Sequence, residues 1–148
     1  MVHALEEVHR LLKPDGTLIE IHPSVEPPPF VEVRTTGELS FSEDDPGFEY
    51  VNDLRDAESA VATVIERGVF AFEDRRRFEL RTHAASVEEL RDHQVVADAY
   101  DPPQKEEELA RRQDEMYARV NDLLGRTSGA DLVYVEPATM SRLTPRLR

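Results

Sequence analysis

Residues 11–16 read Leu-Leu-Lys-Pro-Asp-Gly, and residues 17–21 continue as Thr-Leu-Ile-Glu-Ile. The first stretch predicts the end of a helix, because proline cannot continue the hydrogen-bond ladder and Asp-Gly favours a tight turn. The second is almost wholly apolar, with Glu20 as its one interruption, which predicts a mostly buried strand of a covered sheet. A helix, a tight turn and a buried strand in this order are typical of an α/β domain.

Periodicity on either side of this stretch predicts the other elements. Residues 2–12 place apolar side chains at helical spacing. Further along the chain, strands are expected at 17–21, 30–34, 38–42, 69–82 and 131–136, and helices at 56–67, 87–98 and 104–124. Ser86 and Glu89 have the spacing of a capping box. Pro137 predicts an end, a bulge or an edge position for the last strand.

Composition excludes several classes of function. The 148 residues carry 31 Asp and Glu against 18 Lys and Arg, for a net charge of −13, and contain no cysteine. A disulfide framework, a thiolate metal site and a cysteine nucleophile are therefore excluded, and the charge disfavours nucleic acid and anionic membranes as partners. No apolar run reaches the roughly 20 residues of a membrane helix. We expect a cytoplasmic protein with a single domain over 1–148.

The basic residues are almost all arginine, with only Lys13 and Lys105 as lysines. Low lysine with high acid suits either a GC-rich genome or adaptation to salt. Residues 75–77 are three consecutive arginines, but acidic residues flank them. We expect this run to be a solvated strand with local ion pairs, not a nucleic-acid interface.

The helix over 2–12, the turn at 11–16 and the strand at 17–21 resemble the region around the fifth strand of class I S-adenosylmethionine-dependent methyltransferases. In that family an apolar helix ends in a Leu-Lys-Pro-Gly-Gly-like turn before a buried strand, and here Asp15 replaces the first glycine. The later elements resemble the family's final helix and its antiparallel sixth and seventh strands. The resemblance implies a partial Rossmann-like sheet, from the fifth to the seventh strand and mixed parallel and antiparallel, with flanking helices and a helical insertion at about 99–130.

The cofactor-binding half of that family has no counterpart in this sequence. The family binds its cofactor with a Gly-x-Gly loop after the first strand and an acidic residue that ends the second. No two of the six glycines here lie two residues apart, although such spacing is what lets a backbone approach a ligand closely. The chain is expected to be a carboxy-terminal half, with Met1 inside the helix before the fifth strand. S-adenosylmethionine is implied for the full-length family, and we expect no cofactor for this chain alone.

His22 is the one substrate-side candidate. It follows the strand at 17–21 at its carboxyl end, the side where open α/β sheets bind ligands. The resemblance then implies a base or an orienting group facing the substrate. The alternative is a loop histidine beside Pro23. We assign no other catalytic residue and no cofactor-binding residue.

No metal site is expected. His3 and His9 lie six residues apart on one helix and do not share a face, and His83 and His93 have no partner at ligand spacing. The acidic runs 43–45 and 106–108 lack the alternating ligands and central glycine of a calcium loop. The serines lack a nucleophile-elbow context. The four tyrosines, which are Tyr50, Tyr100, Tyr117 and Tyr134, are expected to be core or interface aromatics.

The strand at 17–21 is expected to have an open edge. In the related family the fifth strand pairs with the fourth on one side, and no fourth strand is evident here. A bare apolar edge is a template for pairing. We expect it to pair with a second copy, as a homodimer, with a separately encoded amino-terminal half, or with a rearranged segment such as 30–34.

Two functions follow as hypotheses. The first is a methyltransferase-like protein or fragment, from an enzyme that methylates a small molecule, inactive alone because methyl transfer depends on positioning the nucleophile against the bound cofactor. The second is a non-catalytic interaction or regulatory module that uses the open strand edge or the acidic helix at 104–124 to bind a protein.

Overall fold

The computed structural model describes residues 1–24, 26–48, 51–98 and 107–146. These residues form an α/β arrangement with four helices and a mostly antiparallel sheet of five strands. The elements in chain order are α1 (Val2–Leu11), β1 (Leu18–Pro23), β2 (Phe30–Thr35), β3 (Glu38–Asp44), α2 (Val51–Glu66), β4 (Phe70–Ala84), α3 (Val87–Asp98), α4 (Glu107–Arg126) and β5 (Ala130–Pro145). The strand order is β1–β5–β2–β3, and β4 also pairs with β5.

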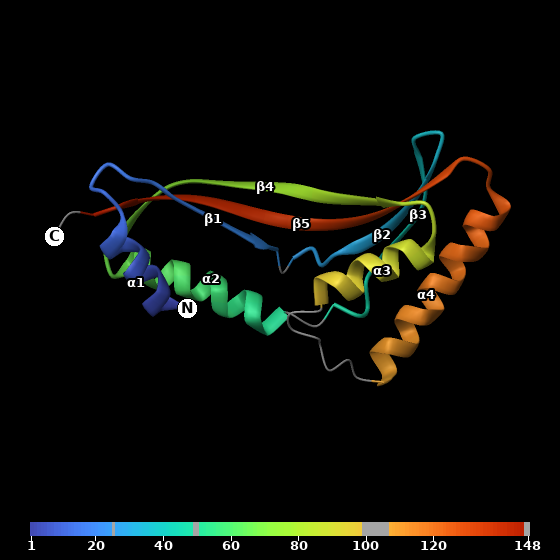
Figure 1. Cartoon of the computed structure of the whole chain (residues 1–148), viewed down its shortest axis with the longest axis horizontal. Coiled ribbons are helices and arrows are strands. Elements are labelled where there is room, and N and C mark those ends of the chain that lie inside the picture. Colours follow the sequence, from blue (N-terminus) through green and yellow to red (C-terminus); the bar gives the residue numbers. More distant parts are fainter. Residues whose placement is uncertain (25, 49–50, 99–106, 147–148) are drawn as a thin grey trace. The chain divides into compact units, whose positions relative to one another are not determined.

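The chain divides into two compact units. The first unit comprises Met1–Pro27, Tyr50–Glu79 and Pro137–Arg148. It holds α1, β1, α2 and the adjoining parts of β4 and β5, and Figure 1 shows α1 and α2 on the same side of its strands. Its buried core joins both helices to the strands and consists of Leu5, Ala60, Val61, Val64, Phe70 and Leu143.

The register of β1 against β5 explains which of its side chains are buried. Leu18 lies opposite Leu143, Glu20 opposite Ser141 and His22 opposite Thr139. Opposed residues share a face, and Leu143 lies in the core with α2, so the even-numbered side chains of β1 face the helices.

The odd-numbered side chains of β1 face the other way. Ile19 and Ile21 are 48% and 57% exposed. The prediction of a mostly buried strand at 17–21 is therefore wrong. The apolar run predicted two covered faces, whereas the helices of this unit cover only the face that carries Leu18.

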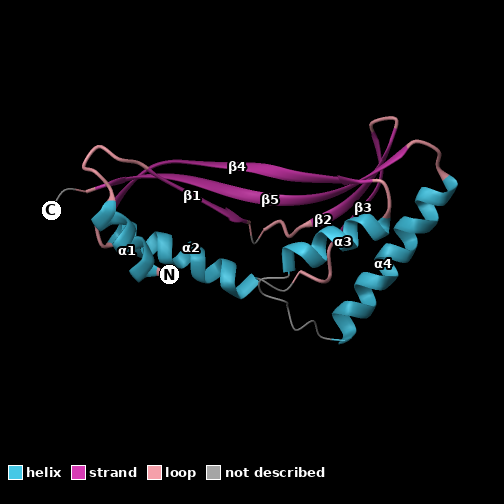
Figure 2. Ribbon diagram, in the orientation of Figure 1, coloured by secondary structure: helices cyan, strands magenta, loops and turns pink. Residues whose placement is uncertain are grey.

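The second unit comprises Pro28–Glu49 and Leu80–Glu136. β2 and β3 form an antiparallel hairpin, and β2 also pairs antiparallel with the first part of β5. Figure 2 shows α3 and α4 on the same side of these strands. Its core is formed by buried side chains of the strands and both helices, including Val31, Val33, Leu90, Met116, Tyr117, Val120, Leu132 and Tyr134.

Most predicted elements are confirmed. The helix at 2–12, the hairpin at 30–42 and the helix at 87–98 correspond to α1, β2 with β3, and α3. The capping of this helix by Ser86 and Glu89 is confirmed, since the Glu89 N–H donates to Ser86 Oγ at 3.2 Å and the Ala85 N–H donates to Glu89 Oε2 at 2.7 Å. The break at 101–103, the start of the helix at 104 and the first part of the expected insertion lie outside the described residues.

Several predictions about the sheet are wrong. The registered pairs of β1, β2 and β3 are all antiparallel, so the expected mixture with parallel pairs is absent from them. The segment 30–34 pairs with β3 and β5, not with β1. α2 begins at Val51, earlier than the expected start at residue 56.

Pro137 does not end the last strand, because β5 continues to Pro145. The registered pairs with β2 end at Val135, and those with β1 begin at Ala138. Pro137 therefore lies where β5 changes its partner from β2 to β1. Its lack of an N–H removes no hydrogen bond from the registered pairs on either side.

The described helices include no segment long and apolar enough to cross a membrane.

Candidate functional site

The end of β1 carries a buried histidine between two carboxylates. His22 is 6% exposed. Its Nδ1 lies 2.6 Å from Oε1 of Glu20, two residues earlier on the same face of β1, and its Nε2 lies 3.4 Å from Oε1 of Glu58 on α2. The predicted substrate-side residue is thus part of a strand and packs under a helix, not in a loop.

The shorter of the two contacts orients the imidazole. A carboxylate acceptor at Nδ1 places the proton of a neutral imidazole there and leaves Nε2 as the exchanging nitrogen. Nε2 faces Glu58, whose side chain is 45% exposed. The buried imidazole therefore lies between a short contact to Glu20 and a longer contact to a carboxylate at the surface.

Glu20 has one oxygen that is not satisfied. Its Oε2 is buried and has no hydrogen-bond partner among the residues that the structure describes. A buried polar atom without a partner costs about 1–3 kcal/mol, and such atoms in native proteins call for an explanation by function or by a bound water or ion.

Buried hydroxyl groups lie on the same face of the strands as Glu20 and His22, and together these side chains form a polar layer. Ser24 Oγ lies 3.0 Å from Thr139 Oγ1, and both residues are buried. Ser141, fully buried opposite Glu20, accepts a hydrogen bond from Arg75 Nε at 3.3 Å. The helix-covered face of the β1–β5 pair thus changes from apolar at Leu18 to polar at His22.

Glu20, His22 and Glu58 are residue types that can ligate a metal ion. No group of three or more histidine, aspartate or glutamate side chains that could hold a metal ion occurs in the described ranges. Nδ1 of His22 is occupied by its short contact with Glu20. The arrangement fits orientation of a polar group by the ring of His22.

The second unit contains a different buried carboxylate, which belongs to the fold. Asp45, 6% exposed, accepts hydrogen bonds from the Gly47 N–H at 2.8 Å, from Gln113 Nε2 at 2.8 Å and from the Tyr134 hydroxyl at 3.0 Å. Burial and the nearby Asp45 carboxylate raise the pKa of Tyr134 well above its usual range. The three donors are neutral groups from the loop after β3, from α4 and from β5. The carboxylate of Asp45 therefore joins these three parts of the second unit.

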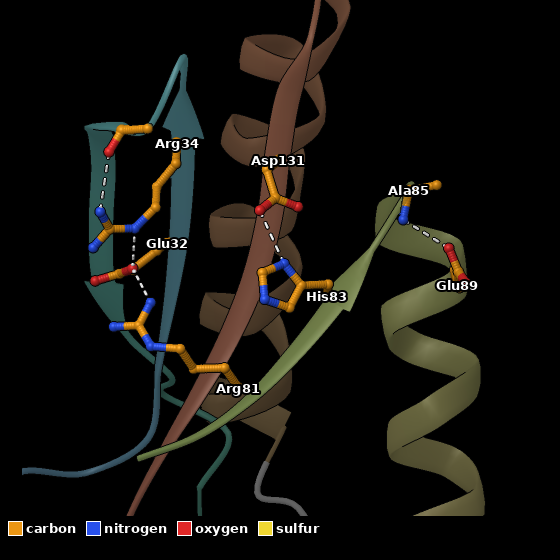
Figure 3. A network of polar contacts seen from close by, with 8 residues as sticks. Glu32, Arg34, Arg81, His83, Ala85, Glu89 and Asp131 are labelled. Atoms are coloured by element: carbon orange, nitrogen blue, oxygen red, sulfur yellow. Dashed lines mark hydrogen bonds and ion pairs between the residues drawn. The ribbon is translucent and has the colours of Figure 1, made fainter. Parts of the chain in front are cut away.

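An arginine–carboxylate network lies on the strands of the second unit, and Figure 3 shows it from close by. Arg34 Nε donates to Glu32 Oε2 at 2.8 Å, and Arg81 donates to the same oxygen at 3.3 Å. The hydrogen bond from Arg34 and the two positive charges lower the pKa of Glu32. His83 Nδ1 lies 2.9 Å from Asp131 Oδ2, a pair exposed to solvent.

His3 and His9 have different contact partners. His3 lies 3.9 Å from Glu6, and His9 Nε2 lies 3.1 Å from the Arg146 carbonyl oxygen. The acidic run at 43–45 divides between roles, since Glu43 forms an ion pair with Arg119 while Asp45 is buried.

Of the predicted aromatics, Tyr117 and Tyr134 lie in the core, as predicted, whereas Tyr50 and Tyr100 lie outside the described residues. Arg76 forms the expected local ion pair with Asp74 at 3.1 Å.

Sequence reasoning found His22 but missed its two partners. In the sequence Glu20 is an interruption of an apolar strand, although its spacing of two from His22 places both side chains on one face. Glu58 is brought to His22 only by the packing of α2, and no local signal in the sequence could have found it. Comparison with protein-family models, with curated proteins and with solved structures finds no match to this chain.

Proposed function

We propose that this chain is a methyltransferase-like domain that resembles the carboxy-terminal half of a class I enzyme and is inactive by itself. The order of elements in the first unit carries the proposal. α1 leads through the turn at residues 11–16 into β1, and β1 is paired antiparallel with the last strand, β5. Among the described strands none pairs with the other edge of β1, which is the edge where the family's fourth strand lies.

The polar layer at the end of β1 fits the substrate side of such a domain. His22, held by Glu20, would orient an acceptor group or take its proton through Nε2. S-adenosylmethionine would supply the methyl group, but the glycine-spaced loop that the family uses to hold it is missing from this sequence. The β2–β3 hairpin of the second unit lies outside the resemblance.

The test is to titrate S-adenosylmethionine calorimetrically into the chain alone and into the chain co-expressed with any polypeptide encoded directly upstream. We expect no saturable heat from the chain alone, and binding once a strand followed by Gly-x-Gly is supplied. Saturable micromolar binding to the chain alone would contradict the proposal, because a cofactor site would then exist without the glycine loop.

The second candidate is a non-catalytic interaction module, favoured by the open edge of β1 with its exposed Ile19 and Ile21. An upstream reading frame without a strand and Gly-x-Gly would support this candidate over the first.

A further inference from the structure

The open edge of β1 presents free backbone groups at known positions. The Ser24 N–H donates to the Pro137 carbonyl at 2.7 Å, and the register pairs Pro23 with Ala138. In an antiparallel ladder alternate residues direct both backbone groups to the same neighbour. Even-numbered residues of β1 therefore bond β5, and Ile19 and Ile21 direct N–H and C=O outward.

Unlike the other two strands that pair with a single described neighbour, β1 exposes no charged side chain. β3 carries Glu38, Glu43 and Asp44, and β4 carries acidic residues around the arginines at 75–77. Charged side chains on edge strands discourage pairing. The only acidic residue of β1 is Glu20, and its side chain is turned toward the helices and bonded to His22.

The exposed face of β1 is complementary to itself. One face exposes Ile19 and Ile21, which gain by covering each other. The other face carries Glu20 and His22, two residues apart, which contact each other within one copy. An antiparallel copy shifted so that Ile21 faces Ile21 brings each Glu20 opposite a His22.

We propose that a second copy of this chain pairs with β1 in antiparallel orientation, about a two-fold axis at Ile21. The two Ile21 residues exchange both backbone hydrogen bonds, and Ile19 donates to the Pro23 carbonyl of the other copy. Pro23 has no N–H to return, so the ladder ends there. A two-fold interface requires such a self-complementary strand.

The pairing is expected to be weak and dependent on salt. A single strand edge buries less than the roughly 1,600 Å² of a standard interface, so the dimer should dissociate on dilution. Each copy carries a net charge of −13, and the long-range repulsion between copies is screened by salt. Raising NaCl from 0.05 to 0.5 M should increase the dimer fraction.

A cysteine cross-link tests the register, because the chain has no cysteine of its own. In the proposed dimer the two Cα atoms at position 21 lie about 5.5 Å apart, within disulfide range. We expect Ile21→Cys to form a covalent dimer under mild oxidation. Ile19→Cys is the matched control, since its two copies lie about 13 Å apart along the strands, and Leu39→Cys on β3 controls for chance collision.

Sedimentation over a range of concentrations tests the association itself. Ile21→Lys should abolish the dimer, whereas Leu39→Lys, at a residue 53% exposed on β3, should keep it. Circular dichroism checks that both variants are folded. A monomer at every concentration, a dimer that survives Ile21→Lys, or cross-linking of Ile19→Cys at the rate of Ile21→Cys would each overturn the proposal.

This inference rests on the edge of β1 and not on the methyltransferase resemblance. The two proposals fail separately, because cofactor binding is read from heat and pairing from mass and cross-linking. A different protein that pairs with β1 in place of the second copy would give a mixed complex in the sedimentation profile. If β1 binds such a protein but the chain never associates with itself, the second-copy proposal is overturned.

Discussion

At Asp45 a single carboxylate accepts hydrogen bonds from a loop amide, a glutamine on α4 and a tyrosine on β5. All four groups are in the buried part of the second unit, where an unpaired polar group is costly. Asp45 thereby fixes the loop that follows β3 against the core.

Asp45→Ala is expected to destabilise the protein by about 3 kcal/mol, because it leaves the donors of Gln113, Tyr134 and Gly47 without their buried acceptor. Urea unfolding followed by circular dichroism measures the change. Asp44→Ala is the matched control, since that neighbour is exposed. Equal effects of the two substitutions would contradict the assigned role.

The residue scale is where sequence reasoning is weakest. The acidic run at 43–45 lacks the pattern of a calcium loop, and its sequence does not show that Asp45 is buried while Asp44 is exposed. The difference depends on Gln113 and Tyr134, which are distant in sequence and arrive by folding. His22 is predictable because it follows a recognisable strand, whereas Glu58 is not, because only tertiary packing joins it to the cluster.

The strands of the second unit contain an ion-pair network that should make stability depend on pH. The pKa of Glu32 is lowered by Arg34 and Arg81. Since the folded pKa is lower than the unfolded value, near 4.3, the carboxylate stabilises the fold above the unfolded pKa. This contribution is lost as the pH falls through the folded pKa.

Glu32→Gln is expected to cost about 1–2 kcal/mol at pH 7 and progressively less as the pH falls below about 4. Chemical unfolding between pH 3 and 7 measures both values. Glu38→Gln, at an exposed residue of the same hairpin, should show no such pH dependence. A constant difference at every pH would exclude the carboxylate charge as the cause.

Glu136 on β5 should behave in the opposite way. Burial raises its pKa, with a smaller opposing effect of His93. Because the folded pKa of Glu136 lies above the unfolded value, stability falls as the pH rises from the unfolded pKa to the folded pKa and the side chain ionises. Glu136→Gln is expected to raise stability at pH 7 by up to about 1 kcal/mol, and to have little effect at pH 3. A loss of stability at pH 7 in the same unfolding measurement would refute this assignment.

Elements were predicted better than their environments. Helical spacing located α1, and alternation located β2 and β3, because these signals are local. The exposure of Ile19 and Ile21 was not predicted, since an apolar run does not tell which faces of a sheet are covered. The length of β5 was underestimated because Pro137 is normally a signal that ends a strand, and here it lies between two sets of registered pairs.

For the whole molecule, the charge of −13 is the dominant electrostatic property. Self-repulsion of this size opposes the folded state, and surface ion pairs offset little of it. The midpoint of thermal unfolding is therefore expected to rise by several degrees between 0.02 and 0.5 M NaCl, because salt screens the repulsion. Scanning fluorimetry measures this midpoint.

A midpoint of unfolding that falls with salt would contradict the charge argument. Cooperative unfolding that appears only near 1 M salt would favour salt adaptation over a GC-rich genome as the origin of the acidic composition.

The sixteen residues of β5 pair with β1, β2 and β4, and they follow all the other described elements in the chain. During synthesis, β1 cannot pair with β5 until Leu143, the partner of Leu18, has been made. Contacts so distant in sequence slow folding, and until β5 leaves the ribosome neither unit has its shared strand. The order of the elements thus makes folding a late event, during which both edges of β1 are exposed to other chains.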